Sequence, residues 1–198
     1  MKLFYTLSSP YAACVRATIS ELKAEHLFEF VETAPFDNNP EFLQANPLGK
    51  VPCLIDEGAA ILDSEVVCDY IDANISGGAL FEQVYANWQL KTFYSMCSGL
   101  IDLSVNRRIE KLREQEGLKS EFWWERYQTA IERTLTEIEK RLSSLPEEFC
   151  IIHISLVCAL NYLDFRHSDF DWRAQHSDLA RFHGEYIKRP CFESSKLS

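Results

Sequence analysis

A change of hydrophobic pattern at Ser76-Gly77-Gly78 divides this chain of 198 residues and limits the folds open to it. Before this point, short strand-like and helix-like segments alternate, whereas after it the apolar residues recur only at helical spacing. Paired glycines interrupt both kinds of segment, and the chain is long enough for two small domains. The sequence therefore predicts a mixed α/β domain over residues 1–76 and an all-helical domain over residues 84–198.

The order of the predicted elements before this boundary is βαβ followed by αββα. Ser9 is a good helix N-cap and Pro10 suits the first helical position, so a helix is expected to begin there after a short strand. A turn at Asp56-Glu57-Gly58 separates two further short strands. The expected strands cover residues 2–6, 28–32, 53–55 and 60–62, and the expected helices cover residues 10–22, 40–45 and 64–74.

The residues after the boundary are expected to form long amphipathic helices around a buried one. One helix is predicted over residues 83–111 and another over residues 121–142, with its apolar side chains on a single stripe. Residues 154–165 are apolar nearly all round, which is typical of a central helix that its neighbours bury. A last helix over residues 177–188 is expected to stop at Arg189-Pro190.

The chain carries 30 acidic and 20 basic residues, which gives a formal net charge of −10. Nucleic-acid binding needs clustered Lys and Arg, and the basic clusters here are interleaved with acids or lie late in predicted helices. We therefore expect no nucleic-acid partner. No apolar run reaches about 18 residues, so we expect no membrane span, and the amino-terminal residues lack the long apolar run of a secretory signal.

Seven cysteines are present, with no C-x-x-C motif and no Cys/His pair at the spacing of a metal site. This usage predicts reduced, mostly buried thiols in a cytoplasmic protein, and it gives no indication of a bound metal. Cys14 lies on the apolar stripe of the first predicted helix and Cys53 lies in a predicted strand, so both are interpreted as core thiols.

Two short motifs, Asn46-Pro47-Leu48-Gly49-Lys50-Val51-Pro52 and Asp63-Ser64, resemble the glutathione-binding segments of the cytosolic glutathione transferases. The resemblance covers essentially the whole chain, because that family joins a thioredoxin-like domain of the order βαβ-αββα to an all-α domain. Within the family, the Ser-Pro start is similar to that of bacterial transferase-like proteins and of tau-, zeta- and beta-like members. The implied fold is therefore that of a glutathione transferase.

The resemblance implies how glutathione is held. The Val51-Pro52 bond should be cis, and the backbone N–H and C=O of Val51 should pair with the cysteinyl unit of glutathione as a strand edge would. The helix start at Asp63-Ser64 should receive the γ-glutamyl group, with Ser64 as N-cap and Asp63 near the α-ammonium group. Lys50 is either a partner of the glycine carboxylate or a solvated surface lysine.

The resemblance also places the catalytic group at Ser9, because serine-type members use a hydroxyl there. Ser9 would donate a hydrogen bond to the glutathione sulfur and, with the adjacent helix N-terminus, would favour the thiolate, which is the nucleophile. The plainer interpretation is that Ser9 only caps the helix. Ser8 is the nearest rival for the catalytic role, Tyr5 is a further one, and Cys14 in such a role would favour disulfide exchange.

The resemblance therefore implies a glutathione transferase that uses glutathione as co-substrate and a small electrophile as second substrate. A homodimer and a role in detoxification are implied with it, and no metal or other organic cofactor is. Glutathione-dependent peroxidase, dehydroascorbate reductase and isomerase activities remain open. The alternative is a non-catalytic relative that binds glutathione or a partner protein and acts in regulation.

One stretch departs from the pattern of the family. The buried helix of the second domain usually begins with a capping box, Ser/Thr-x-x-Asp, whereas this chain has Cys150-Ile151-Ile152-His153. Losing both halves of the box would cost about 1 kcal/mol, so we expect a less stable helix start here.

Overall fold

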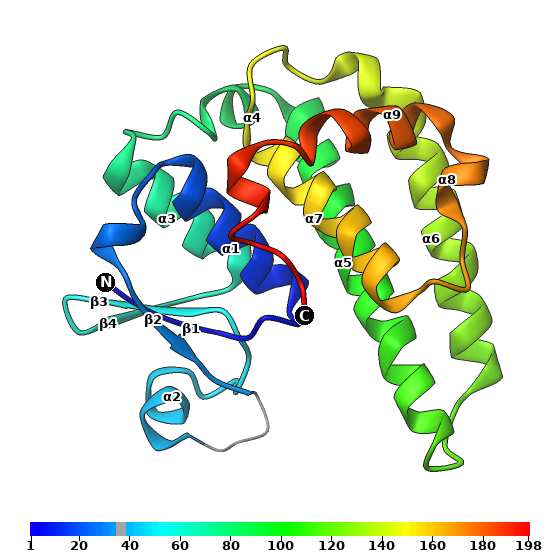
Figure 1. The fold of residues 1–198 in the computed structure, drawn as a ribbon, viewed down its shortest axis with the longest axis horizontal. Coiled ribbons are helices and arrows are strands. Elements are labelled where there is room, and N and C mark those ends of the chain that lie inside the picture. The colour runs from blue at the N-terminus through cyan, green and yellow to red at the C-terminus, as the bar shows by residue number, and fades with distance from the viewer. Residues whose placement is uncertain (35–38) are drawn as a thin grey trace. The chain divides into compact units, whose positions relative to one another are not determined.

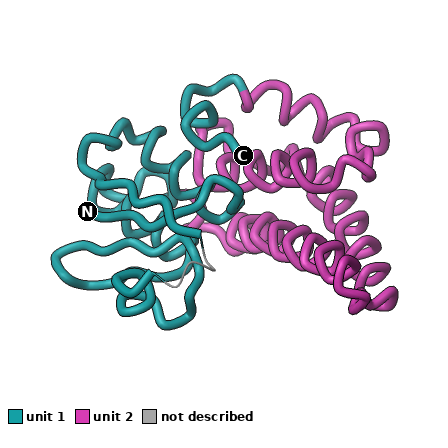
Figure 2. The backbone as a smooth tube through the Cα atoms, turned by 60° about the horizontal axis from the view of Figure 1, so that its bottom comes forward, with its two compact units in different colours: residues 1–82, 188–198 teal, residues 83–187 magenta. Residues whose placement is uncertain are grey.

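The computed structural model describes residues 1–34 and 39–198. The described chain forms two compact units, one of residues 1–82 with 188–198 and one of residues 83–187 (Figure 2). The predicted domain bounds, 1–76 and 84–198, stay a prediction. The structure adds that the last eleven residues of the sequence pack with the amino-terminal unit, although they follow the helical unit along the chain.

The amino-terminal unit is built on a four-stranded mixed sheet (Figure 1). The strands are β1 (Lys2–Tyr5), β2 (Glu29–Glu32), β3 (Cys53–Asp56) and β4 (Ala59–Leu62), in the spatial order β2-β1-β3-β4. β1 runs parallel to β2 and antiparallel to β3, and β3 runs antiparallel to β4. The helices between them are α1 (Pro10–Glu21), α2 (Pro40–Ala45) and α3 (Ser64–Ile75), with a short 3₁₀ turn at Glu25–Leu27. The predicted βαβ-αββα order is thus confirmed, and the predicted bounds agree to within one residue.

Alternating strand residues bury the two faces of this sheet under different helices. Phe4 and Cys53 face α2, where they pack with Phe42 and Val51 in one cluster. Leu3 and Leu54, one position along each strand, are fully buried on the opposite face, on which α1 and α3 lie (Figure 1). Helices therefore cover both faces of the sheet, and the ends of the strands remain available for a binding site.

Residues 188–198 belong to the amino-terminal unit (Figure 2), in which they contact α1. Arg189 forms an ion pair with Glu21 near the end of α1. The Nη2 atom of Arg16, in the middle of the helix, donates a hydrogen bond of 2.7 Å to the carbonyl oxygen of Lys196. A 3₁₀ turn at Pro190–Phe192 packs against the same helix and buries the side chains of Cys191 and Phe192.

The second unit is all-helical and is organised around α7 (Ile151–Arg166), most of whose side chains are buried. α5 (Trp88–Glu114) packs against both α7 and α6 (Glu121–Arg141), and α9 (Ser177–Tyr186) packs against α7 and α8 (Trp172–Gln175). A 3₁₀ turn at Leu142–Ser144 follows α6. The predicted buried central helix is confirmed, although it begins three residues earlier than expected.

The predicted long helix over residues 83–111 is wrong in one respect, because the structure divides it at Asn87. α4 (Glu82–Ala86) ends there, and the Oδ1 atom of Asn87 accepts hydrogen bonds from the backbone N–H groups of Gln89 and Leu90. An asparagine amide that bonds to nearby backbone competes with a continuous helix and favours a new N-terminus. α5 therefore starts at Trp88 with its own cap.

The start of α7 also corrects an expectation, since the capping box is replaced and not lost. The Nδ1 atom of His153 accepts a hydrogen bond of 3.2 Å from the backbone N–H of Cys150, as the carboxylate of the usual box would. The sulfur of Cys150 takes the position of the usual hydroxyl oxygen. His153 also stacks on Phe182 and lies against Tyr186, so aromatic packing holds the imidazole in place.

Candidate functional site

The strand register brings three separate segments to one end of the sheet. Cys53, the first residue of β3, lies opposite both Phe4 on β1 and Leu62 on β4. Because both pairings are antiparallel, the segment that precedes β3 lies beside the segments that follow β1 and β4. Val51-Pro52 is therefore a neighbour of Asp63-Ser64 on one side and of the turn that leads to Ser9 on the other.

The Val51-Pro52 peptide bond is cis, as the resemblance implied. Val51 stands immediately before β3, outside the paired residues of that strand. Its side chain is buried in the cluster with Phe4 and Phe42, which fixes the position of its backbone. Lys50, the preceding residue, is exposed.

Asp63, and not Ser64 as expected, is the N-cap of α3. Its Oδ1 atom accepts a hydrogen bond of 2.9 Å from the backbone N–H of Glu65, and Ser64 is the first helical residue. The φ angle of Asp63 is 74°, a conformation that few residues other than glycine adopt. Such backbone conformations cost free energy and cluster at ligand sites. The helix start thus combines a carboxylate, the N-terminus of a helix and an unusual backbone conformation.

Ser9 caps α1 in the predicted manner. Its Oγ atom accepts a hydrogen bond of 3.2 Å from the backbone N–H of Ala12, and its own backbone N–H bonds to the carbonyl oxygen of Thr6. A hydroxyl that accepts through oxygen still has its proton to donate. Ser9 can therefore cap the helix and donate a hydrogen bond to a ligand at the same time.

The rivals of Ser9 differ in their surroundings. Tyr5 is the last residue of β1, and its ring contacts the guanidinium of Arg16 at 5.4 Å and the ring of Phe30 edge-on. Ser8 is half-buried in the turn before Ser9. Cys14 is buried one turn inside α1, as predicted for a core thiol.

All seven cysteines are buried, and none of them forms a disulfide. Burial raises the pKa of the Cys53 thiol to about 11, and burial also raises the pKa of Cys68 well above its ordinary value. A thiol with a raised pKa is a poor nucleophile at neutral pH, because the thiolate is the reactive form. The interpretation of Cys53 as a core residue is consistent with this environment.

Asn46 belongs to the site segment, but its part there was not predicted. The residue is 2% exposed, and its side chain makes hydrogen bonds with the backbone of Leu48 and Lys50. The signal that was available is the Asn-Pro-x-Gly order, which is typical of turns in which asparagine bonds to the backbone two residues on.

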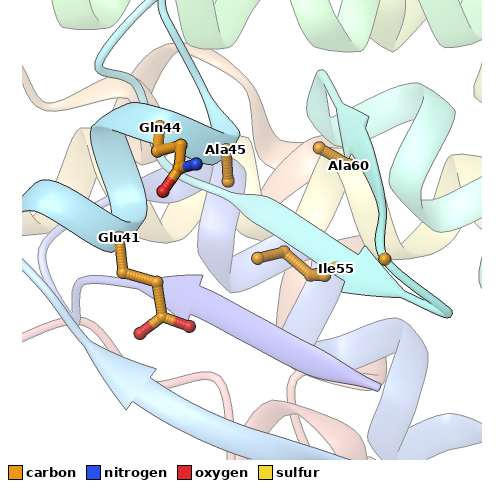
Figure 3. Close-up of a pocket in the computed structure, with 6 residues that line it drawn as sticks. Glu41, Gln44, Ala45, Ile55 and Ala60 are labelled. Atoms are coloured by element: carbon orange, nitrogen blue, oxygen red, sulfur yellow. The ribbon is translucent and has the colours of Figure 1, made fainter.

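An open pocket of about 320 Å³ lies elsewhere on the amino-terminal unit (Figure 3). Ile55 lines it from β3, Ala60 from β4 and Gly58 from the turn between them, at the opposite end of these strands from Pro52 and Asp63. Glu41 and Gln44 line it from α2, and Glu41 is already paired with Lys2 at 2.7 Å. This pocket is therefore separate from the gathered strand ends.

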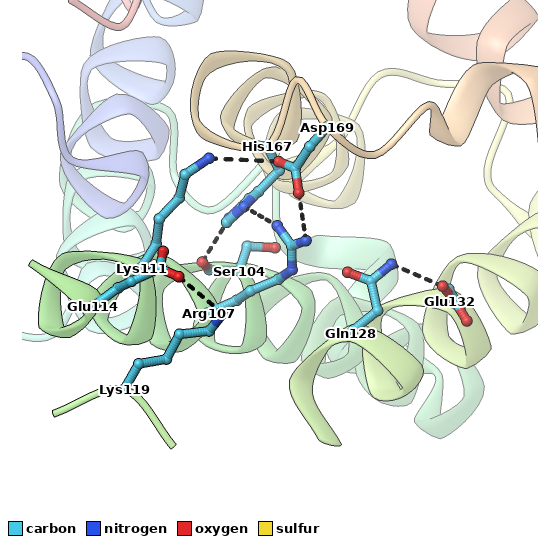
Figure 4. Close-up of polar contacts among 9 residues, drawn as sticks. All are labelled: Ser104, Arg107, Lys111, Glu114, Lys119, Gln128, Glu132, His167 and Asp169. Atoms are coloured by element: carbon cyan, nitrogen blue, oxygen red, sulfur yellow. Dashed lines mark hydrogen bonds and ion pairs between the residues drawn. The ribbon is translucent and has the colours of Figure 1, made fainter. Parts of the chain in front are cut away.

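A buried polar cluster joins α5 to the end of α7 in the helical unit (Figure 4). The Nδ1 atom of His167 lies 2.6 Å from Nη1 of Arg107, and its Nε2 atom lies 2.8 Å from the carbonyl oxygen of Ser104. Arg107 also pairs with Asp169 at 2.7 Å and stacks on Trp124 at 4.0 Å. Burial, helped by the charge of Arg107, lowers the pKa of His167 to about 4. The arrangement suits a neutral imidazole that holds the two helices together.

Metal-binding clusters and membrane-spanning helices are both absent from the described part of the chain. Over residues 1–34 and 39–198, no group of three or more His, Cys, Asp or Glu side chains is placed to hold a metal ion. Over the same residues, no helix is long and apolar enough to cross a membrane.

The protein joins a thioredoxin-like unit, in which a cis proline precedes β3, to an all-helical unit. This combination of units is the one that identifies its family. Two family models match it: "Glutathione S-transferase, N-terminal domain" over residues 3–78 and "Glutathione S-transferase, C-terminal domain" over residues 121–185. A crystal structure of a glutathione transferase family member from Pseudomonas fluorescens Pf-5, with bound glutathione, is 31% identical and has a TM-score of 0.88. The match covers 100% of this chain and 98% of that chain. The chain belongs to the glutathione S-transferase family.

Two further relatives are similar over nearly their whole length. The crystal structure of a glutathione S-transferase from Methylobacillus flagellatus KT with glutathione bound is 27% identical, with a TM-score of 0.89 and coverage of 100% of this chain and 99% of that one. The uncharacterized GST-like protein YibF of Escherichia coli strain K12 is 26% identical over 97% of this chain and 96% of its own.

Proposed function

We propose that the chain is a glutathione transferase that binds glutathione where Ser9, Val51-Pro52 and Asp63-Ser64 meet. The observation that carries this proposal is the strand register, which gathers the three segments at one end of the sheet. Two similar crystal structures of family members with glutathione bound support it.

In this proposal each part of glutathione meets a different group. The cysteinyl unit pairs with the backbone N–H and C=O of Val51, next to Pro52. The γ-glutamyl carboxylate lies at the start of α3, where the backbone N–H of Ser64 and the helix dipole favour an anion, and Asp63 faces the α-ammonium group. Lys50 is exposed beside this segment and is the cation available to the glycine carboxylate.

Ser9 acts on the sulfur. A hydrogen bond from its hydroxyl, together with the N-terminus of α1, stabilises the thiolate and lowers the pKa of the glutathione thiol. The thiolate lone pair then forms a sulfur–carbon bond with a small electrophile. In a substitution the leaving group departs with its bonding electrons, and in an addition solvent supplies a proton to the carbanion.

We also propose that the protein acts in the cytoplasm as a homodimer and that conjugation serves detoxification. Seven buried cysteines without a disulfide suit a reducing compartment, and none is placed as an exposed reactive thiol. Light scattering of the purified protein tests the dimer directly, since a single species of one-chain mass contradicts it.

Calorimetric titration with glutathione, followed by a conjugation assay on a panel of electrophiles, tests the function. Binding with turnover of any electrophile supports the transferase. Binding without turnover across the whole panel favours the non-catalytic alternative, and absence of binding contradicts the proposed site itself.

A further inference from the structure

Asn46 uses its whole side-chain amide inside the loop between α2 and β3. Its Nδ2 atom donates a hydrogen bond of 2.6 Å to the carbonyl oxygen of Lys50, and its Oδ1 atom accepts one of 3.0 Å from the backbone N–H of Leu48. Its backbone joins the same loop, because its carbonyl oxygen accepts from the N–H of Gly49 and its N–H donates to Phe42. The loop is thus closed around one buried side chain.

The bond to Lys50 has a consequence for the next residue. The carbonyl of Lys50 and the N–H of Val51 belong to one planar peptide unit, and this peptide is not among the cis bonds of the described chain. In a trans unit the N–H points away from the carbonyl oxygen. Since Asn46 holds the Lys50 oxygen toward the buried side of the loop, it directs the N–H of Val51 to the opposite side.

The sheet does not orient the peptide unit between Lys50 and Val51. β3 pairing begins only at Cys53, on the far side of Pro52. The buried Val51 side chain fixes where the residue lies but leaves the rotation of the preceding peptide plane to the loop. Gly49, with a φ of 61°, allows the chain to turn toward Asn46 before it reaches this plane.

We propose that Asn46 is a positioning residue for glutathione: it fixes the peptide plane whose N–H, that of Val51, donates a hydrogen bond to the cysteinyl carbonyl oxygen of the ligand. This inference rests on the proposed function. It assigns a role to the donor half of the amide in particular, because it is Nδ2 that bonds to the Lys50 oxygen. The acceptor half closes the turn through Leu48.

The decisive variant is Asn46→Asp, which keeps an acceptor for Leu48 and removes the donor to Lys50. At pH 7.5 the introduced carboxylate faces the carbonyl oxygen of Lys50 and cannot donate to it, so the peptide plane between Lys50 and Val51 is no longer held. Glutathione affinity, measured by calorimetry, should therefore fall about tenfold. At pH 5 the introduced carboxyl, whose pKa is raised by burial, carries a proton that it can donate to Lys50. The loss of affinity relative to the unchanged protein should therefore shrink at pH 5.

Asn46→Ser supplies the second variant. A serine hydroxyl still accepts from the N–H two residues on, so the turn is kept, but it is too short to reach Lys50. Its affinity should also fall about tenfold, by the same amount at both pH values. In both variants kcat at saturating glutathione should stay within about twofold of the unchanged protein, because the thiol and Ser9 are untouched. Asn74→Ala, which removes an amide that bonds to Tyr70 on α3, is the matched control and should bind normally.

The outcomes separate the two proposals. If the unchanged protein does not bind glutathione, the proposed function fails and this inference fails with it. If the unchanged protein binds glutathione and both Asn46 variants bind it as tightly as the unchanged protein does, the role of Asn46 alone is overturned. It is also overturned if the Asn46→Asp loss is the same at pH 5 as at pH 7.5, because a general weakening of the loop has no reason to be repaired by one proton.

Discussion

Ser9 and Asp63 are both helix N-caps at the same end of the sheet. Each side-chain oxygen accepts a backbone N–H of the first helical turn, so each residue stabilises its helix whether or not a ligand is bound. Each also keeps a capacity that capping does not use, a hydroxyl proton in Ser9 and a second carboxylate oxygen in Asp63. Variants at these positions must therefore separate loss of a cap from loss of a ligand contact.

Replacing Ser9 by alanine should reduce turnover far more than it reduces glutathione affinity. The variant loses the donor to the sulfur, and we expect kcat to fall by about two orders of magnitude, as for the removal of one donor to a developing anion. Loss of the cap should lower the free energy of unfolding by about 1 kcal/mol as well. The measurement is steady-state kinetics with calorimetry on the same preparations.

Two controls accompany the Ser9→Ala variant. Ser120→Ala removes a comparable cap, that of α6, and should lower stability without changing turnover. Ser8→Ala tests the nearest rival. Turnover that is unchanged in Ser9→Ala would assign the contact with the sulfur to Ser8, Tyr5 or Cys14.

At Asp63 we predict that replacement by asparagine and replacement by alanine act differently. Asp63→Asn keeps a good cap and tolerates a positive φ but removes the charge. Its stability should stay close to that of the unchanged protein, while glutathione affinity falls about tenfold because the α-ammonium group loses its charged partner. Asp63→Ala should in addition lower the free energy of unfolding by about 2 kcal/mol, since it loses the cap and adopts the backbone conformation poorly. Calorimetry and denaturant unfolding measure the two effects, and equal stability of the two variants contradicts this account.

The site residues were predictable to different degrees. Ser9 was recognised as a cap because Ser-Pro before an apolar stripe is a local signal, and Val51-Pro52 was recognised from its motif. Ser64 was taken for the cap of α3, because serine is a common cap and nothing local shows that Asp63 has a φ of 74°. The role of Asn46 was missed because it depends on how the loop folds back to Lys50, which spacing alone does not reveal.

Among the secondary-structure elements, local patterns located the strands and helices of the first unit to within one residue. The errors lie in the helical unit and have physical causes. Asn87 divides a stretch that is amphipathic on both sides of it, so periodicity favoured one helix where capping produces two. At the start of α7, the usual box residues are absent and an imidazole supplies the acceptor, which a pattern of Ser, Thr or Asp does not include.

His153 should therefore be important for the stability of α7. His153→Ala removes the acceptor for the N–H of Cys150 and the ring that packs against Phe182 and Tyr186, so we expect the free energy of unfolding to fall by about 3 kcal/mol. His153→Asn restores a short acceptor without the ring and should recover part of the loss. His26→Ala, at an exposed position, is the control, and denaturant unfolding is the measurement. If His153→Ala is as stable as His26→Ala, the imidazole does not replace the box.

For the whole molecule, the division into a mixed unit and a helical unit was predictable from the change of pattern at Ser76-Gly77-Gly78. The return of residues 188–198 to the first unit was not. It depends on contacts between positions far apart in the sequence, such as Arg16 with the carbonyl of Lys196 and Arg189 with Glu21. Each partner alone is an ordinary charged residue near a helix, so only the folded chain shows that they meet.

The pH dependence of unfolding should report the buried cluster around His167. In the folded protein the pKa of His167 is lowered to about 4, chiefly by burial and then by the charge of Arg107, whereas an unfolded histidine has a pKa of about 6.5. Between these values the unfolded state binds more protons, so the free energy of unfolding falls as the pH falls from about 6.5 to about 4 and levels off below. The contribution of this one group between pH 7 and 4.5 should be about 2 kcal/mol.

His167→Gln isolates that contribution, because an amide can accept from Arg107 and donate to Ser104 without titrating. All four tryptophans, at positions 88, 123, 124 and 172, lie in the helical unit, so denaturant unfolding followed by tryptophan fluorescence observes the unit that contains His167. Burial also lowers the pKa of His183, and acidic residues titrate at the low end of the range, but these groups are common to both proteins and cancel in the difference. The free energy of unfolding of the variant should therefore rise relative to that of the unchanged protein as the pH falls. If the free energies of unfolding of the two proteins run parallel from pH 7 to 4.5, His167 is protonated to the same extent in the folded and unfolded states. That result would contradict a neutral imidazole between Arg107 and Ser104.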